Sequence, residues 1–194
     1  MALARFNSFA NDERGFSLLE VLVASTLLTV GVLALGQLFA LSTTSNTASK
    51  NTSYATGLAE QKMEELRALA WGFDKDGLPL SDTTSDTTVS PETTTGGAGL
   101  TPSPSTALQQ NTKGYVDYID KFGKKTGTGD VIPPDDAVYT RRWSIEPLPT
   151  NPNNTLIIQV LVTPYRNRGQ ADQGNVNRLN NEARLITVKT RKAS

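Results

Sequence analysis

The sequence lacks the side chains on which most catalytic and metal-binding chemistry depends. Its 194 residues include no histidine and no cysteine, so it can form no disulfide, no nucleophile–histidine pair and no ordinary zinc site. An enzyme would then need a pair of carboxylates for acid–base catalysis. The candidates Asp135, Asp136 and Asp172 have no partner that the sequence assigns, so we expect no catalytic residue and no cofactor.

Two acidic segments contain oxygen atoms that could bind a metal ion, but their spacing matches no known metal-binding loop. Asp74-Lys75-Asp76-Gly77 is too short for a calcium-binding loop, and the segment 164–182 matches no loop rule. We interpret both segments as surface turns and expect no metal site.

The acid with the most informative position is Glu20. It stands at the head of an apolar run, and no charged residue occurs from Val21 to Ser49. A carboxylate near the centre of a bilayer costs roughly 2–3 kcal/mol or more, although the positive end of a helix favours an anion in its first turn by about 0.3–1 kcal/mol. An acid in this position needs a partner or a function.

The apolar run must be helical if it lies in a membrane, because hydrocarbon offers no partner for backbone amides. Residues 16–41 would span roughly 39 Å as a helix, enough to cross a hydrocarbon core of about 30 Å. We therefore expect a transmembrane helix over 16–41, preceded by a short polar segment over 1–15.

Two general alternatives account for the hydrophobicity of this run. A secretory signal peptide would be cut after an apolar stretch of about 7–15 residues, and Ala40-Leu41-Ser42 imitates such a cut, but the run is too long and begins with Glu20. A plain signal-anchor fits the length but gives no reason for Gly15-Phe16 or for Glu20.

The segment Arg14-Gly15-Phe16-Ser17-Leu18-Leu19-Glu20 resembles the processing site of type IV prepilins and type II secretion pseudopilins. The resemblance implies that a prepilin peptidase cuts between Gly15 and Phe16 on the cytoplasmic side, so that 1–15 is a leader peptide. It also implies N-methylation of Phe16 and retention of the apolar segment.

Glu20 matches the glutamate of that family, the fifth residue of the mature chain. In the family this residue is associated with the amino group of a neighbouring subunit's first residue during assembly. The pairing is physically reasonable, because an amine and a carboxylate relieve each other's burial cost in a low dielectric. The LLEVLVA variant resembles the minor pilin and minor pseudopilin branches more than the major subunits.

Helical periodicity resumes after the polar stretch that follows Ser42. One face carries Ala55, Leu58, Ala59, Lys62, Met63, Leu66 and Leu69, and the other carries Glu60, Gln61, Glu64, Glu65 and Arg67. We expect one long helix over 16–71, whose second half packs this seam on a sheet.

The remaining chain divides into a loop and a sheet domain. Residues 72–113 are rich in Ser, Thr, Gly and Pro and predict a long exposed loop. Residues 114–194 predict an antiparallel sheet of three or four strands at 115–119, 138–146, 155–163 and 183–190, with 155–163 central. We interpret Arg141 and Arg142 as a solvated strand face. We therefore expect an α+β fold with the helix packed on the sheet. The resemblance implies the same layout, that of a pilin head domain.

The resulting hypothesis is a non-catalytic minor pilin or pseudopilin that primes or joins a type IV pilus or a type II secretion pseudopilus. Its implied partners are other pilin or pseudopilin subunits, the prepilin peptidase, the assembly platform and the bacterial inner membrane, with the sheet domain in the periplasm. A pilus-tip adhesion or DNA-uptake module and a membrane-anchored periplasmic enzyme remain as alternatives. A formal net charge of zero gives no reason to expect nucleic acid as the main partner.

Overall fold

The computed structural model describes residues 16–89, 91–93, 96–127, 129–165 and 182–192, so the predicted leader 1–15 lies outside them. One helix precedes seven strands in the order α1 (Leu18–Ala68), β1 (Trp71–Phe73), β2 (Pro79–Ser81), β3 (Val116–Ile119), β4 (Lys125–Thr126), β5 (Tyr139–Pro147), β6 (Thr155–Pro164) and β7 (Ala183–Thr190). The chain forms two compact units, 1–45 and 46–194, whose boundary falls within α1.

The part of α1 in the first unit exposes its large apolar side chains all around the helix, from Leu18 to Leu41. Its hydroxyls are satisfied locally, since Thr26 and Thr29 donate to the carbonyls of Leu22 and Ser25 at 2.8 Å. The helix is long and apolar enough to cross a membrane.

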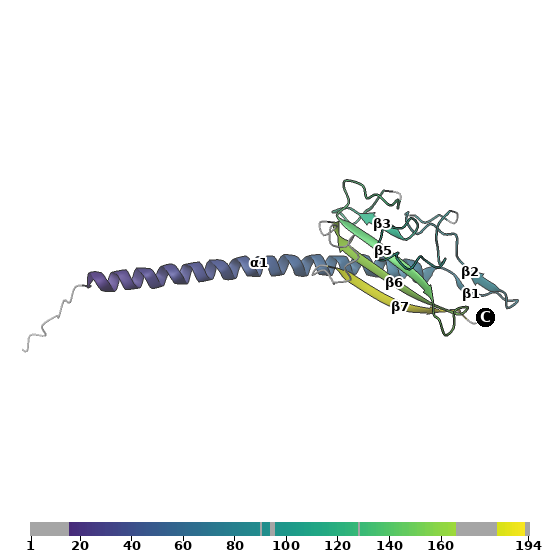
Figure 1. Ribbon diagram of the computed structural model, residues 1–194, viewed down its shortest axis with the longest axis horizontal. Coiled ribbons are helices and arrows are strands. Elements are labelled where there is room, and N and C mark those ends of the chain that lie inside the picture. The colour runs from purple at the N-terminus through teal and green to yellow at the C-terminus, as the bar shows by residue number, and fades with distance from the viewer. Residues whose placement is uncertain (1–15, 90, 94–95, 128, 166–181, 193–194) are drawn as a thin grey trace, which may run out of the picture. The chain divides into compact units, whose positions relative to one another are not determined.

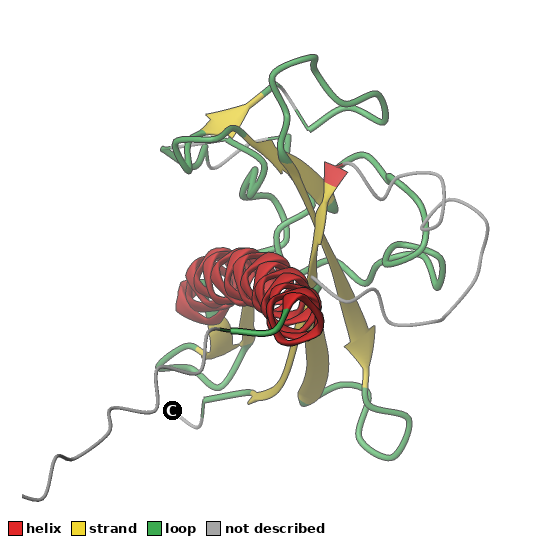
Figure 2. Cartoon of the chain, turned by 90° about the vertical axis from the view of Figure 1, so that its left-hand side faces the viewer, coloured by secondary structure: helices red, strands yellow, loops and turns green. Residues whose placement is uncertain are grey.

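The part of α1 in the second unit lies along one face of the large sheet (Figure 2). Its buried residues are Ala55, Leu58, Ala59, Lys62, Met63 and Leu66. The opposing strands alternate, so that every second side chain points at the helix. Trp143, Ile145, Ile158 and Val160 are fully buried in this core. The predicted α+β architecture is therefore confirmed.

The large sheet has five antiparallel strands in the order β4-β3-β5-β6-β7, and β1 and β2 form a separate hairpin (Figure 1). Strands β5, β6 and β7 form a meander in which Trp143 faces Val160 and Val160 faces Leu185. The four predicted strands correspond to β3, β5, β6 and β7. The predicted central position of 155–163 is wrong, because β5 occupies the centre and β6 lies beside it.

The prediction of an exposed loop over residues 72–113 is wrong in part: the described residues between β2 and β3 form no helix or long strand, but several of them are buried. This segment contains the β1–β2 hairpin, and Leu100 and Ala107 belong to the hydrophobic core. Its composition is poor in apolar residues, but hydrogen bonds compensate for that deficit. The carboxylate of Asp82 accepts from the backbone and hydroxyl of Ser85, and that of Asp86 accepts from both groups of Thr88.

A close backbone crossing within this segment requires glycine. The Gly97 amide donates to the Thr84 carbonyl at 3.0 Å. A Cβ atom at position 97 would lie 2.1 Å from the Cα of Asp86, so no other residue fits without moving the backbone.

A lysine on β7 caps the C-terminal end of α1. Lys189 on β7 donates from Nζ to the carbonyls of Leu66, Arg67 and Leu69, three of the groups that a helix C-terminus leaves without intrahelical partners. Partial burial lowers the pKa of this lysine, and Arg67 lowers it further. Because it lies against these carbonyls, the ammonium also complements the negative end of the helix dipole.

We expect Lys189→Met to lower the free energy of unfolding by about 1–2 kcal/mol, because it removes the donors and the favourable charge at the helix terminus. Thermal unfolding of the full chain in detergent, followed by near-UV circular dichroism of the buried Trp143, measures this loss. Lys192→Met is the matched control, since that lysine is exposed. Equal effects of the two substitutions would contradict the capping role.

Candidate functional site

The first described residues form the start of α1. Phe16 is exposed, and Ser17 precedes the first helical residue, Leu18. The Ser17 carbonyl accepts from the amides of Glu20 at 2.9 Å and Val21 at 3.2 Å, so the helix is hydrogen-bonded from its first turn. Gly15, on the other side of the predicted cleavage site, lies outside the described residues.

Glu20 is the acidic residue of this first turn, where the helix dipole favours an anion. It lines one shallow hollow of the helix surface together with Ser17, Leu19, Val23, Ala24 and Leu27. Among the described residues, no cation lies within ion-pair distance of its carboxylate. The site therefore presents an anion on an apolar helix, and an ammonium group is the partner that its chemistry suits.

A family model described as the prokaryotic N-terminal methylation motif matches residues 10–36. This range includes Gly15, Phe16, Glu20 and most of the apolar run. The N-terminal segment thus carries the methylation motif of type IV prepilin-like proteins. No curated protein and no solved structure matches the chain significantly.

A motif of this kind implies a structural, non-catalytic subunit. It supports partnership with other pilin subunits and with the prepilin peptidase in general. The apolar helix that follows is consistent with a single-pass anchor in the inner membrane.

The most concentrated group of ionisable side chains lies in the sheet domain, between α1 and the sheet. Arg141 on β5 donates to both carboxylate oxygens of Asp117 on β3, at 2.9 and 2.8 Å. Lys62 on α1 lies 3.3 Å from the same carboxylate. The side chains of Lys62, Asp117 and Arg141 are 0%, 1% and 0% exposed, so these three charges lie in the interior.

Two further charges complete this group, which we call the buried ion cluster (Lys62, Glu65, Asp117, Lys125 and Arg141). The Glu65 carboxylate pairs with Lys62 at 2.9 Å and with Lys125 at 3.3 Å. Lys62 also donates to the Thr87 carbonyl and lies 4.3 Å from the centre of the Trp143 ring. Each buried charge thus has an opposite charge or an aromatic face beside it.

The buried ion cluster corrects two interpretations of the sequence. Arg141 and Arg142 do not form a solvated strand face, because both are buried, and Arg142 donates to Asn111 at 2.9 Å. Glu65 does not lie on the solvent side of the helix, since its side chain is only 22% exposed. The alternation of Arg141 with Trp143 and Ile145 was a signal that this arginine faces the core.

Electrostatics within the cluster favours its charged carboxylates. Burial alone would raise the pKa of Asp117, but the adjacent Lys62 and Arg141 outweigh burial and hold that pKa below its ordinary value. Burial likewise opposes ionisation of Glu65, and Lys62 overcomes it and lowers the Glu65 pKa. Burial lowers the pKa of Lys62, while Asp117 opposes that shift.

The other acidic candidates from the sequence are separate from this cluster. Asp135 and Asp136 lie on an exposed loop, and Asp136 accepts a hydrogen bond from the Thr126 hydroxyl at 2.8 Å. Asp172 lies outside the described residues. Asp74 accepts from the amides of Asp76 and Leu78 and thereby closes the turn of the β1–β2 hairpin.

We expect the sheet domain to lose stability as the pH falls through and below the ordinary carboxyl pKa values of 4.5 for Glu65 and 3.8 for Asp117. Both values are lowered by folding, so the unfolded state takes up protons first and acid favours unfolding. Unfolding midpoints of the full chain, measured in detergent between pH 3 and 7, test this dependence.

Glu65→Gln should reduce this acid sensitivity because it removes one of the two groups responsible. Glu64→Gln, one residue away on the same helix, is the control, since the Glu64 carboxylate is exposed and pairs only at the surface with Arg67. Identical acid profiles for the two variants would show that the cluster does not govern the pH dependence.

Proposed function

We propose that this protein is a minor pilin or minor pseudopilin that is cut after Gly15, methylated on Phe16 and assembled through its N-terminal helix. The observation that carries the proposal is the position of Glu20. This carboxylate lies in the methylation motif, at the head of an apolar helix, with no ion-pair partner among the described residues.

Cleavage between Gly15 and Phe16 would create the complementary group. The new α-amino group of Phe16 is a cation near neutral pH, and methylation keeps that charge while adding apolar surface. Within one chain this amine lies one helical turn before Glu20. The amine of a neighbouring subunit, displaced along the axis of a helical bundle, can instead approach the carboxylate directly.

The pairing would set the register of the subunits. An unpaired charge in hydrocarbon is costly, and removal of one partner of a buried ion pair costs about 3–5 kcal/mol. Subunits that enter the bundle at another height would leave both charges unpaired. Apolar contacts between the helices would hold the subunits together without fixing their relative height. The pairing of Phe16 with Glu20 would fix that height.

This function would place the sheet domain in the periplasm and the mature protein in a pilus or pseudopilus. The alternative of a tip adhesin or DNA-uptake module depended on an exposed Thr-rich or Asn-rich loop. The Thr-rich segment is partly buried, with Thr87 and Leu100 in the interior, and most of the Asn-rich segment lies outside the described residues. The structural role in the filament is therefore the better supported proposal.

The first test is the N-terminus of the protein isolated from membranes. In cells with an active prepilin peptidase we expect a chain that begins at methylated Phe16, and in cells without the enzyme we expect one that begins at Met1. Mass spectrometry of the N-terminal peptide distinguishes them. A chain that still begins at Met1 despite the peptidase, or that begins at Thr43, would refute the proposed processing.

The second test separates assembly from processing. We expect Glu20→Ala and Glu20→Gln to be inserted and cut normally but to be recovered in filaments at a level reduced by more than about 100-fold, since a lost partner costs about 3 kcal/mol or more. Ser25→Ala is the control, because the Ser25 hydroxyl only donates to the Leu22 carbonyl of its own helix. Normal incorporation of the Glu20 variants would overturn the pairing.

A further inference from the structure

The turn between β3 and β4 displays an aromatic side chain between two lysines. Phe122 is 80% exposed, and the ammonium group of Lys121 lies 4.9 Å from the centre of its ring. Lys124 follows two residues later and is also exposed. We call residues 120–124 the β3–β4 turn, in which Asp120 is the only acid.

The backbone of the β3–β4 turn is fixed by its own hydrogen bonds. The Asp120 carboxylate accepts from the amides of Phe122 at 2.8 Å and Lys124 at 2.9 Å. Gly123 has a φ of +83°, a left-handed conformation that glycine adopts without strain. A fixed turn that keeps a phenylalanine in water forgoes the benefit of burying it, but it is organised in advance for binding.

The β3–β4 turn lies beside Tyr54 on α1. A Cβ atom at Gly123 would lie 2.6 Å from the Tyr54 hydroxyl, so the turn and this side chain are neighbours. Tyr54 is 40% exposed. Lys50 is exposed one helical turn earlier on the same face of α1, and it is the only charged residue from 42 to 59.

These side chains form one surface, which we call the basic aromatic tip (Lys50, Tyr54, Lys121, Phe122 and Lys124). None of its three lysines forms an ion pair with another described residue. Aromatic rings and lysines are the residue types that proteins present to the headgroup layer of a bilayer. The tip therefore suits a partner that is anionic at its surface and apolar beneath.

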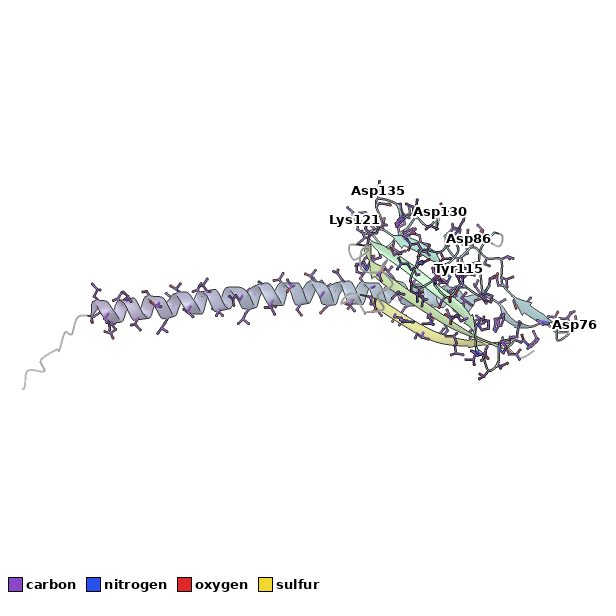
Figure 3. The ribbon with its side chains drawn as sticks, viewed as in Figure 1. Asp76, Asp86, Tyr115, Lys121, Asp130 and Asp135 are labelled. Atoms are coloured by element: carbon purple, nitrogen blue, oxygen red, sulfur yellow. The ribbon has the colours of Figure 1, made fainter. Side chains whose placement is uncertain are left out.

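The tip lies at the end of the sheet domain where the domain's part of α1 begins. Lys121 and Asp76 lie at opposite ends of the domain, and Asp76 belongs to the hairpin that follows the C-terminal end of α1 (Figure 3). The helix advances roughly 20 Å from Leu41, the last residue of the predicted membrane span, to Tyr54. The headgroup layer covers about 5–8 Å of this length. A tilt of about 20° toward the tip, ordinary for a membrane-spanning helix, lowers the tip further.

We propose that the basic aromatic tip docks the sheet domain on the anionic phospholipid surface of the membrane that α1 spans. Phe122 enters the headgroup layer, and the three lysines pair with lipid phosphates. Docking holds the domain of an unassembled subunit at the bilayer. The inference rests on the membrane location of α1 and goes beyond the proposed function, which requires only the N-terminal helix.

The absence of cysteine allows a single fluorescent label to test this docking. Full-length Phe122→Cys is labelled with the environment-sensitive fluorophore NBD and placed in nanodiscs of phosphatidylcholine with or without phosphatidylglycerol. We expect severalfold higher, blue-shifted emission in the anionic discs. About 1 M salt should abolish this gain, because it shortens the range of charge interactions to about 3 Å. The control is Leu78→Cys, which is 63% exposed on the β1–β2 hairpin and should report water in both discs.

Three outcomes would contradict the proposal. Emission at position 122 that does not depend on phosphatidylglycerol would overturn it, as would an equal response at position 78. A label that is shielded in both kinds of disc and in detergent would indicate a contact with protein, and this result would overturn the proposal as well.

Removal of charge tests the contact with lipid phosphates. Lys121→Gln together with Lys124→Gln in the labelled chain should lower the ratio of docked to free domains about 30-fold, because each lysine near an anionic surface contributes about fivefold. Lys75→Gln together with Lys192→Gln removes the same charge from exposed positions at the hairpin end and should leave the ratio unchanged. Equal effects of the two pairs would refute the contact.

The same variants separate docking from the proposed function. Glu20→Ala should leave the emission of the label at position 122 unchanged, because the tip does not include that acid. Methylation of Phe16, measured by mass spectrometry of protein from cells with the prepilin peptidase, should be unchanged in the lysine variants. Failure of docking with normal methylation would therefore count against the tip alone.

Discussion

The sheet domain depends on one buried carboxylate that two cations share. Asp117 joins β3 to β5 through Arg141 and to α1 through Lys62, so a single side chain fixes three elements at once. Taking such charges out of water costs several kcal/mol each, and only full pairing offsets that cost. The Trp143 ring and Glu65 complete the arrangement around Lys62. A different docking of the helix would leave at least one of these ions unpaired, so the cluster selects one arrangement.

The cost of an unpaired charge in an apolar environment also applies to the N-terminal motif, but there no compensating charge lies nearby among the described residues. Within the buried ion cluster every charge has an opposite charge beside it, whereas Glu20 has no such partner among the described residues. The domain is thereby complete as a folded unit, whereas the proposed pairing would give Glu20 its cation only from another molecule. This contrast explains why the ionisable groups of the domain stabilise it, while the single acid of the apolar helix is suited to assembly.

The sequence predicted what depends on periodicity and on local motifs. The apolar run, the seam from Ala55 to Leu66 and the positions of four strands follow from spacings of 3.6 and 2 residues. The burial of Arg141 could not be predicted with the same ease, because an arginine on a strand is usually solvated. The groups that stabilise it in the interior, the Asp117 carboxylate and the Leu58 carbonyl, are distant from it in the sequence. The order within residues 72–113 was missed because hydrogen bonds from Asp82 and Asp86 replace apolar contacts there.

The cap that Lys189 forms on the end of α1 links residues that are about 120 positions apart in the chain. Contacts of such long range form late and slow the folding of a domain. Because synthesis delivers β7 after the other strands, the end of α1 and one edge of the sheet stay open until β7 has been made. The nascent domain therefore passes through an unfinished stage in which chaperones and proteases can reach that edge.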